Sequence, residues 1–120
     1  MTLRRVRWAL VGTGGIGRRT LGDLRLCDTA EVVAVCSRSR ASADEFARTW
    51  NLPLAFHDFA ALCESPDVDA VYIGTPHSTH FDYARRALMA RKHVLCEKPL
   101  TMTAVEAQEL GRHAAEAGVF

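Results

Sequence analysis

Lysine is scarce in this sequence, which has thirteen arginines but only two lysines. Acidic groups nearly balance the basic ones, and the formal net charge is +1. The chain therefore lacks the strong single-sign field that attracts nucleic acid or an anionic membrane. It also lacks an apolar run approaching the roughly 18 residues that a membrane-spanning helix needs. We expect neither nucleic acid nor a membrane among its partners.

Paired cysteines and metal-ligand clusters are also missing. The four cysteines are widely spaced and form no C-x-x-C pair, which favours free thiols in a reducing cytoplasm. His77 and His80 stand three residues apart, but no cysteine or carboxylate lies at ligand spacing around them, so no metal site is expected. The N-terminal "RRVRWALVG" resembles a twin-arginine export signal only briefly. Its apolar stretch is too short, and we expect a mature cytoplasmic N-terminus.

What is present is an ordinary globular composition, with 48% apolar and 24% charged residues. The 120 residues allow one domain, 1–120. Short apolar runs alternate along it with amphipathic stretches. Strands are predicted at 6–12, 31–37, 54–58, 69–74 and 92–96. Helices are predicted at about 16–27, 42–50, 59–64, 78–90 and 103–118, the second and last opened by capping boxes at Ser42 and Thr103.

Strands that alternate with helices are typical of a parallel sheet covered by helices on both faces. We therefore predict an α/β fold, a Rossmann-like doubly wound parallel sheet. The closing "VF" looks like the first two residues of a further strand. The expected domain is thus cut off near its last strand.

The sequence "GTGGIG" places the pattern G-x-G-x-x-G between the first strand and the first helix. Within a βαβ unit, this pattern predicts a dinucleotide site. Gly12 allows a tight turn, Gly14 lets the backbone approach a pyrophosphate, and Gly17 lets the helix pack closely on the sheet. The helix N-terminus offers free N–H groups to the phosphates. The predicted loop consists of Gly12, Thr13, Gly14, Gly15, Ile16 and Gly17. The alternative is a glycine-rich turn without a ligand.

The end of the second strand predicts which cofactor is bound. An NAD site normally has an Asp or Glu there for the ribose 2′-hydroxyl, whereas this chain has Ser37, Arg38, Ser39 and Arg40. Arginine binds phosphate through two parallel hydrogen bonds. We therefore predict NADP(H) as the preferred cofactor, held by Ser37, Arg38 and Arg40, with NAD(H) possible. The alternative is that both arginines only decorate a loop.

Two further polar clusters follow strands, and the carboxyl ends of parallel strands share one edge of the sheet, where ligands bind. The candidate cofactor-binding residues there are Thr75, Pro76, His77, His80, Glu97 and Lys98. His80 has two interpretations: it packs against the strand loop, or it lines the nicotinamide pocket. Glu97 has three: it orients Lys98, binds cofactor ribose, or caps the turn.

Lys98 is the candidate catalytic residue, because a lysine can release a proton where an arginine cannot usefully do so. A cationic nicotinamide nearby would favour that release, and Pro99 restricts the conformation of Lys98. Lys92 has no such apparent role. Composition alone leaves two roles equally open, catalysis and the merely polar end of a strand.

Four segments in order, "VGTGGIG", the "SR" after the second strand, "DAVYIGTPHSTH" and "KHVLCEKPL", resemble the Gfo/Idh/MocA oxidoreductases over essentially the whole chain. The closing "AAEAGVF" looks most like the dihydrodiol and sugar dehydrogenase branch. The resemblance implies that Lys98 is the acid or base of hydride transfer between NADP(H) and a sugar, polyol or cyclic diol. It also implies that Ser37 and Arg38 bind the 2′-phosphate and that Thr75, Pro76 and His80 line the cofactor cleft.

Two departures from the family accompany the resemblance. Arg91 stands where the family usually has a helix-ending glycine, so it either adopts a left-handed conformation or the helix ends differently. The family's second α/β domain, which supplies the substrate pocket and usually the dimer interface, is absent. We expect this chain to bind cofactor but turn over poorly, and the full-length protein to be a homo-oligomer. Two other functions stay open: a non-catalytic redox-sensing or regulatory module, and a reductase of imines or tetrapyrroles.

Overall fold

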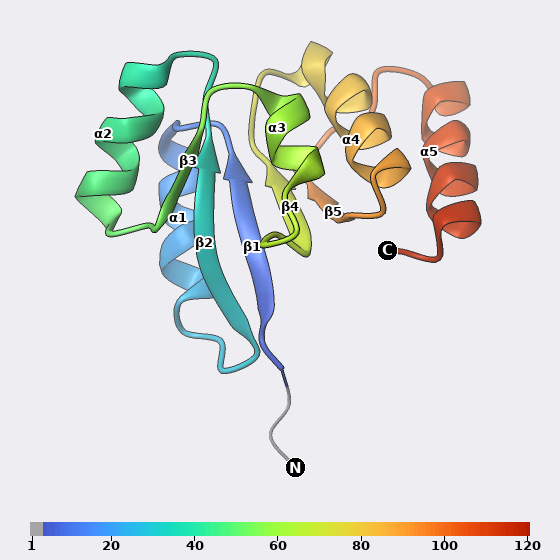
Figure 1. The fold of residues 1–120 in the computed structure, drawn as a ribbon. Coiled ribbons are helices and arrows are strands. Elements are labelled where there is room, and N and C mark those ends of the chain that lie inside the picture. Colours follow the sequence, from blue (N-terminus) through green and yellow to red (C-terminus); the bar gives the residue numbers. More distant parts are fainter. Residues whose placement is uncertain (1–3) are drawn as a thin grey trace.

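The computed structural model describes residues 4–120. Five parallel strands form one sheet in the order β3-β2-β1-β4-β5 (Figure 1). The strands are β1 (Val6–Val11), β2 (Ala30–Cys36), β3 (Leu54–Phe56), β4 (Ala70–Ile73) and β5 (His93–Cys96). The helices are α1 (Gly15–Leu24), α2 (Arg40–Trp50), α3 (Phe59–Glu64), α4 (His80–Met89) and α5 (Ala104–Ala117), with a 3-10 turn at His77–Thr79. The predicted doubly wound sheet is confirmed.

Helices cover both faces of the sheet, as the alternating pattern predicted (Figure 1). On one face, Leu21 of α1 and Phe46 of α2 pack against Val35 and other strand side chains. On the other, Leu62 of α3 and Leu88 of α4 belong to the second core cluster, to which α5 also contributes. All four residues of β4 are buried, because a central parallel strand is covered on both sides and reads as a continuous apolar run.

Local capping sets the helix ends, and some of them differ from the predicted boundaries. The helix expected from Ser42 begins at Arg40, because the Oγ of Ser39 accepts a hydrogen bond from the backbone N–H of Ser42 at 3.3 Å. The first helix ends at Leu24 instead of residue 27. The cap at Thr103 is confirmed, and its Oγ1 accepts from the N–H of Glu106 at 3.2 Å.

The connection from α4 to β5 shows which conformation Arg91 adopts and what role Lys92 has. Arg91 has a φ of 61°, so the left-handed alternative is the one that the chain adopts. Lys92 is buried, and its Nζ donates to the carbonyl oxygens of Ser65 and Val68 at 2.6 and 2.7 Å. Burial lowers the pKa of Lys92. Lys92 thus ties the loop before β4 to the start of β5, which is a structural role.

The last two residues lie beside β5, although no strand is formed there. The N–H of Val94 donates to the carbonyl oxygen of Phe120 at 2.8 Å.

The first three residues, where the expectation about the N-terminus begins, lie outside the described part. All four cysteines are free; Cys36 is buried, whereas Cys27 is exposed. Within residues 4–120, no helix is long and apolar enough to cross a membrane.

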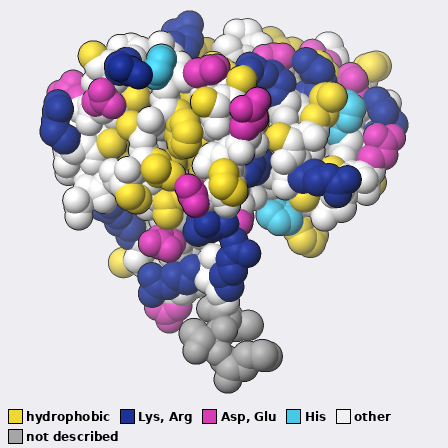
Figure 2. All heavy atoms as spheres, in the orientation of Figure 1, with side chains coloured by type: hydrophobic (Ala, Val, Ile, Leu, Met, Phe, Trp, Pro, Cys, Tyr) yellow, Lys and Arg dark blue, Asp and Glu magenta, His cyan; other side chains and the backbone are white. Residues whose placement is uncertain are grey.

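Charged side chains of both signs are mixed over the face shown in Figure 2. In the same residues 4–120, no group of three or more His, Cys, Asp or Glu side chains could hold a metal ion. A bidentate ion pair lies at the amino end of the sheet. The guanidinium of Arg7 donates to both carboxylate oxygens of Asp69, at 3.0 and 3.1 Å, and its backbone N–H donates at 2.8 Å.

This contact gives a pH-dependent prediction for stability. The hydrogen bonds from Arg7 lower the pKa of Asp69 from 3.8 to about 2. A lowered carboxyl pKa stabilises the fold above its unfolded value, and that contribution is lost as pH falls from about 4 towards 2. Asp69→Asn should lower the free energy of unfolding at pH 7 by about 1 to 2 kcal/mol, with a smaller loss at pH 2.5, measured by urea unfolding. Asp67→Asn is the control, since Asp67 is 64% exposed; equal effects of the two changes would contradict the prediction.

Candidate functional site

The glycine loop has the conformation predicted for it. Gly12 has a φ of 107°, and a Cβ there would lie 3.1 Å from the carbonyl oxygen of Gly74. A Cβ on Gly17 would lie 3.2 Å from the carbonyl oxygen of Gly12, which confirms the close packing of α1 on the sheet. At Gly14 a Cβ would meet no protein atom within 4 Å. That open side leaves room for a ligand to approach the backbone.

The start of α1 presents its backbone to this open side. Gly14 is the N-cap residue, and no side chain accepts a hydrogen bond there. The first N–H groups of a helix have no partner within the helix and attract anions. The loop therefore fits a diphosphate, which would supply acceptors for these N–H groups.

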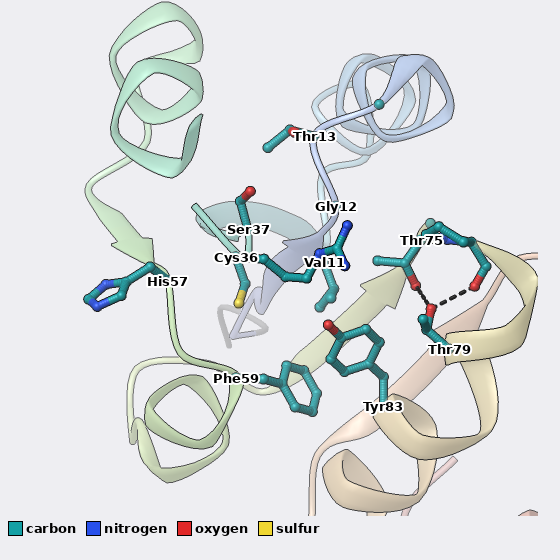
Figure 3. A pocket seen from close by; sticks show the side chains of 14 residues that line it. Val11, Gly12, Thr13, Cys36, Ser37, His57, Phe59, Thr75, Thr79 and Tyr83 are labelled. Carbon is teal, nitrogen blue, oxygen red and sulfur yellow. Dashed lines mark hydrogen bonds between the residues drawn. The ribbon is translucent and has the colours of Figure 1, made fainter. Parts of the chain in front are cut away.

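An open cleft of about 270 Å³ lies beside the loop, at the carboxyl ends of β1, β2 and β4 (Figure 3). Ser37 and Arg38 line it, as does the glycine loop. The rings of Phe59 and Tyr83 meet edge to face with their centroids 4.7 Å apart. The cleft residues that the sequence did not indicate are Val11, Cys36, His57, Phe59, Gly74, Thr79 and Tyr83. His57 follows β3 directly, and its place at the carboxyl end of a strand is the signal that could have identified it.

A second cleft of about 210 Å³ is lined by Ile16, Gly74, Thr75, His77, Glu97 and Lys98. Gly74 and Thr75 line both clefts. The predicted polar clusters therefore converge on one edge of the sheet, and the two clefts meet there. Together the two clefts extend from the turn after β2 to the loop after β5.

The turn after β2 offers cationic side chains to the first cleft. Arg38 lines the cleft and is exposed, whereas Arg40 opens α2 and lines neither cleft. Among residues 4–120, neither arginine forms an ion pair. Ser37 accepts a hydrogen bond from the N–H of Ser39 at 3.4 Å. The positive charge of Arg38 is thus available to an anionic ligand, while a contact from Arg40 stays a prediction.

His80 lies between the two strand loops and contributes no surface to either cleft. It is fully buried. Its Nδ1 is 2.7 Å from the carbonyl oxygen of Pro99, and its Nε2 is 2.9 Å from that of Thr75. The geometry corresponds to the first interpretation, in which this histidine packs against the strand loop. Pro76 is exposed and lines the first cleft together with Thr79, whose hydroxyl donates to the carbonyl oxygen of Pro76 at 2.6 Å.

Glu97 and Lys98 stand at the other end of the site. Lys98 is exposed and lines the second cleft, and the Lys98–Pro99 peptide bond is cis. The hydroxyl of Tyr72 donates to Oε2 of Glu97 at 2.6 Å, a partner that sequence reasoning did not identify. This hydrogen bond lowers the pKa of Glu97, so that the carboxylate is ionised beside Lys98.

A parallel sheet with a glycine loop at its reversal point and polar side chains along the same edge defines a dinucleotide-binding protein of the Rossmann type. The chain belongs to the Gfo/Idh/MocA family, whose model, described as an oxidoreductase family with an NAD-binding Rossmann fold, matches residues 6–120. The resemblance inferred from the motifs is confirmed.

The chain is similar to named dihydrodiol dehydrogenases. The trans-1,2-dihydrobenzene-1,2-diol dehydrogenase of Danio rerio is 37% identical over 117 residues, covering 96% of this chain and 35% of that protein. The Bos taurus enzyme of the same name is 38% identical over 117 residues, with the same coverage. The chain thus spans about a third of the length of these relatives.

Solved structures confirm the fold. A 3-ketoreductase from Actinomadura kijaniata, in complex with TDP-benzene and NADP, matches with a TM-score of 0.91 and 36% identity, covering 98% of this chain and 37% of that one. An NAD-binding oxidoreductase from Klebsiella pneumoniae matches with a TM-score of 0.89 and 32% identity, covering 96% of this chain and 33% of that one.

Proposed function

We propose that this chain is the cofactor-binding domain of an NADP(H)-dependent oxidoreductase. The full-length protein would transfer a hydride between the nicotinamide and a carbonyl or secondary alcohol of a sugar, polyol or cyclic diol. The observation that supports this is the convergence of the glycine loop, the Arg38 turn and Lys98 on two adjoining clefts. The diol dehydrogenases and the NADP-bound ketoreductase among its relatives support the same substrate class.

The residues of the two clefts have distinct parts in this proposal. The glycine loop and the start of α1 hold the diphosphate, and Arg38 holds the 2′-phosphate. When bound, the nicotinamide supplies or accepts the hydride at its C4. In oxidation, the Nζ of Lys98 takes the hydroxyl proton of the substrate, and in reduction it returns a proton to the carbonyl oxygen.

The substrate pocket, the partner of Lys98 and the oligomeric contacts belong to the remainder of the full-length protein. We propose a second α/β domain for that part, because the family relatives are about three times as long as this chain. The homo-oligomeric assembly is proposed from the family resemblance alone. Size-exclusion chromatography with light scattering on the full-length protein tests the assembly.

The proposed activity is tested by screening the full-length protein for NADP reduction and NADPH oxidation. Sugars, polyols and trans-1,2-dihydrobenzene-1,2-diol are the substrates to include. Turnover of a member of this set would support the proposal. Tight NADPH binding without turnover of any diol, sugar or polyol would instead favour the regulatory module.

Cofactor preference gives a separate prediction for Arg38. Arg38→Ala should weaken NADPH binding by about 10- to 100-fold, because a charge-assisted hydrogen bond to phosphate is lost. NADH has no 2′-phosphate, so its affinity should change by less than about twofold. Isothermal titration calorimetry measures both, and Arg48→Ala, on α2 away from both clefts, is the matched control. If Arg38→Ala weakened NADPH and NADH equally, the assignment would be wrong.

A further inference from the structure

Tyr72 reaches from β4 to the end of the neighbouring strand β5, in the candidate active site. It lies in β4, opposite Leu95 of the parallel neighbour β5. The N–H of Glu97 donates to the carbonyl oxygen of Ile73 at 2.9 Å, so Glu97 continues the ladder just beyond β5. Because side chains alternate along a strand, Tyr72, Leu95 and Glu97 share one face of the sheet. Tyr72 and Glu97 are therefore diagonal neighbours, a distance that a tyrosine spans.

The ring of Tyr72 is held firmly in this position. Tyr72 is 3% exposed and belongs to the core cluster beneath α1 and α2. Beside the ring runs the backbone of Gly74, where an added Cβ would lie 3.1 Å from Cε1 of Tyr72 and 3.1 Å from Cγ2 of Ile16. The absence of a side chain at Gly74 lets the phenol ring pass to the edge of the sheet. A core residue thereby places its hydroxyl beside Glu97, which lines the second cleft.

That hydroxyl fixes one side of the Glu97 carboxylate. Oε2 accepts from Tyr72 at 2.6 Å, while Oε1 lies 3.4 Å from the N–H of Lys98, a long contact. An ionised carboxylate has about four acceptor positions, so Oε1 keeps capacity for a hydroxyl of a ligand in the second cleft. Burial, with the contact to Glu97 as the next cause, raises the pKa of Tyr72 to about 12. The phenol therefore remains a donor at neutral pH.

We propose that Tyr72 is a positioning residue, which holds the Glu97 carboxylate towards the nicotinamide-ribose half of the bound cofactor. The inference rests on the proposed function, since it places the nicotinamide half in the second cleft, beside Lys98. It selects ribose binding among the three interpretations of Glu97. It also assigns Tyr72 a role at a site to which it contributes no exposed surface.

Two ligands separate this role from a general effect on the fold. NADPH spans both halves of the site, whereas adenosine 2′,5′-bisphosphate lacks the nicotinamide and its ribose. Tyr72→Phe keeps the ring and removes only the hydroxyl. It should weaken NADPH binding by about tenfold, because the Glu97 carboxylate is no longer held for its own charge-assisted hydrogen bond to the ribose. The affinity for adenosine 2′,5′-bisphosphate should stay within about twofold of the wild-type value. Both affinities are measured by calorimetry on the full-length protein.

A double-mutant cycle then asks whether Tyr72 acts through Glu97. Glu97→Gln should weaken NADPH binding at least as much, and the double change Tyr72→Phe with Glu97→Gln should be no worse than Glu97→Gln alone. Additive losses, equal weakening of both ligands, or an unchanged NADPH affinity in Tyr72→Phe would overturn the proposal. Each of these results is distinct from failure of the proposed function, in which the wild-type protein binds neither ligand.

Carboxyl NMR gives a readout that needs no ligand. In Tyr72→Phe the pKa of Glu97 should rise towards its ordinary value, because the hydrogen bond from Tyr72 is the largest cause of its lowering. Lys98 and His80 also lower the pKa of Glu97, and both are retained in the variant. A Glu97 titration that is identical in wild type and Tyr72→Phe would overturn the proposal even if the protein bound no nucleotide.

Discussion

Lys98→Met in the full-length protein should reduce kcat by about 10³-fold, the contribution expected of a general acid or base. Methionine has a similar length and no proton to exchange. Lys98 lies at the exposed end of the second cleft, away from the core, so that unfolding should not contribute to the loss. NADPH binding, which in the proposed site depends mainly on the glycine loop and Arg38, should change by no more than a few fold. Steady-state kinetics and calorimetry on the same preparation measure the two effects.

Lys98→Arg separates proton transfer from positive charge. Arginine keeps the charge but remains protonated at any working pH, so this variant should lose turnover nearly as completely as Lys98→Met. If Lys98→Arg retained most of the wild-type kcat, Lys98 would act as an electrostatic group and the assignment of an acid or base would be wrong. Full activity in both variants would remove Lys98 from the reaction altogether.

Gly12→Ala should have the largest effect on stability. The alanine would have to adopt a φ of 107° and place its Cβ 3.1 Å from the backbone oxygen of Gly74. Backbone strain and overpacking together cost about 2 to 4 kcal/mol. Both strands that end at this point, β1 and β4, are central to the sheet. Chemical unfolding should therefore show a much lower midpoint, and NADPH binding should weaken because the loop moves.

Gly22→Ala is the matched control for this change. Gly22 is exposed within α1, and a Cβ there would meet no atom within 4 Å. Alanine in a helix is favoured over glycine by roughly 0.5 to 1 kcal/mol, so Gly22→Ala should slightly raise the stability. If the two variants shifted stability in the same direction and by the same amount, steric constraint at Gly12 would not be the cause.

Local signals in the sequence were sufficient to predict the fold and the edge of the sheet at which the candidate site lies. Apolar runs predicted all five strands, and the position of G-x-G-x-x-G between the first strand and the first helix predicted the glycine loop. The same reasoning placed Arg38, Thr75 and Lys98 on a shared edge, because carboxyl ends of parallel strands lie together. Boundaries were less accurate at the second helix, where Ser39 and Ser42 are both suitable caps and only the folded backbone decides between them.

The contacts that hold the site together depend on packing between segments that are distant in sequence. Tyr72 looks like any apolar strand residue, and its contact with Glu97, 25 residues later, depends on strand register. His80 could not be assigned from its helix alone, because its two partners, Thr75 and Pro99, come from separate loops. Phe59 and Tyr83 reach the first cleft from two different helices for the same reason.

A crystal structure of the full-length protein with NADPH tests the central claim most directly. We predict that the diphosphate lies on the backbone from Gly12 to Gly17, the 2′-phosphate beside Arg38, and the nicotinamide in the second cleft with its C4 facing the Nζ of Lys98. A nicotinamide bound elsewhere, or a Lys98 amine directed away from the ring, would contradict the claim.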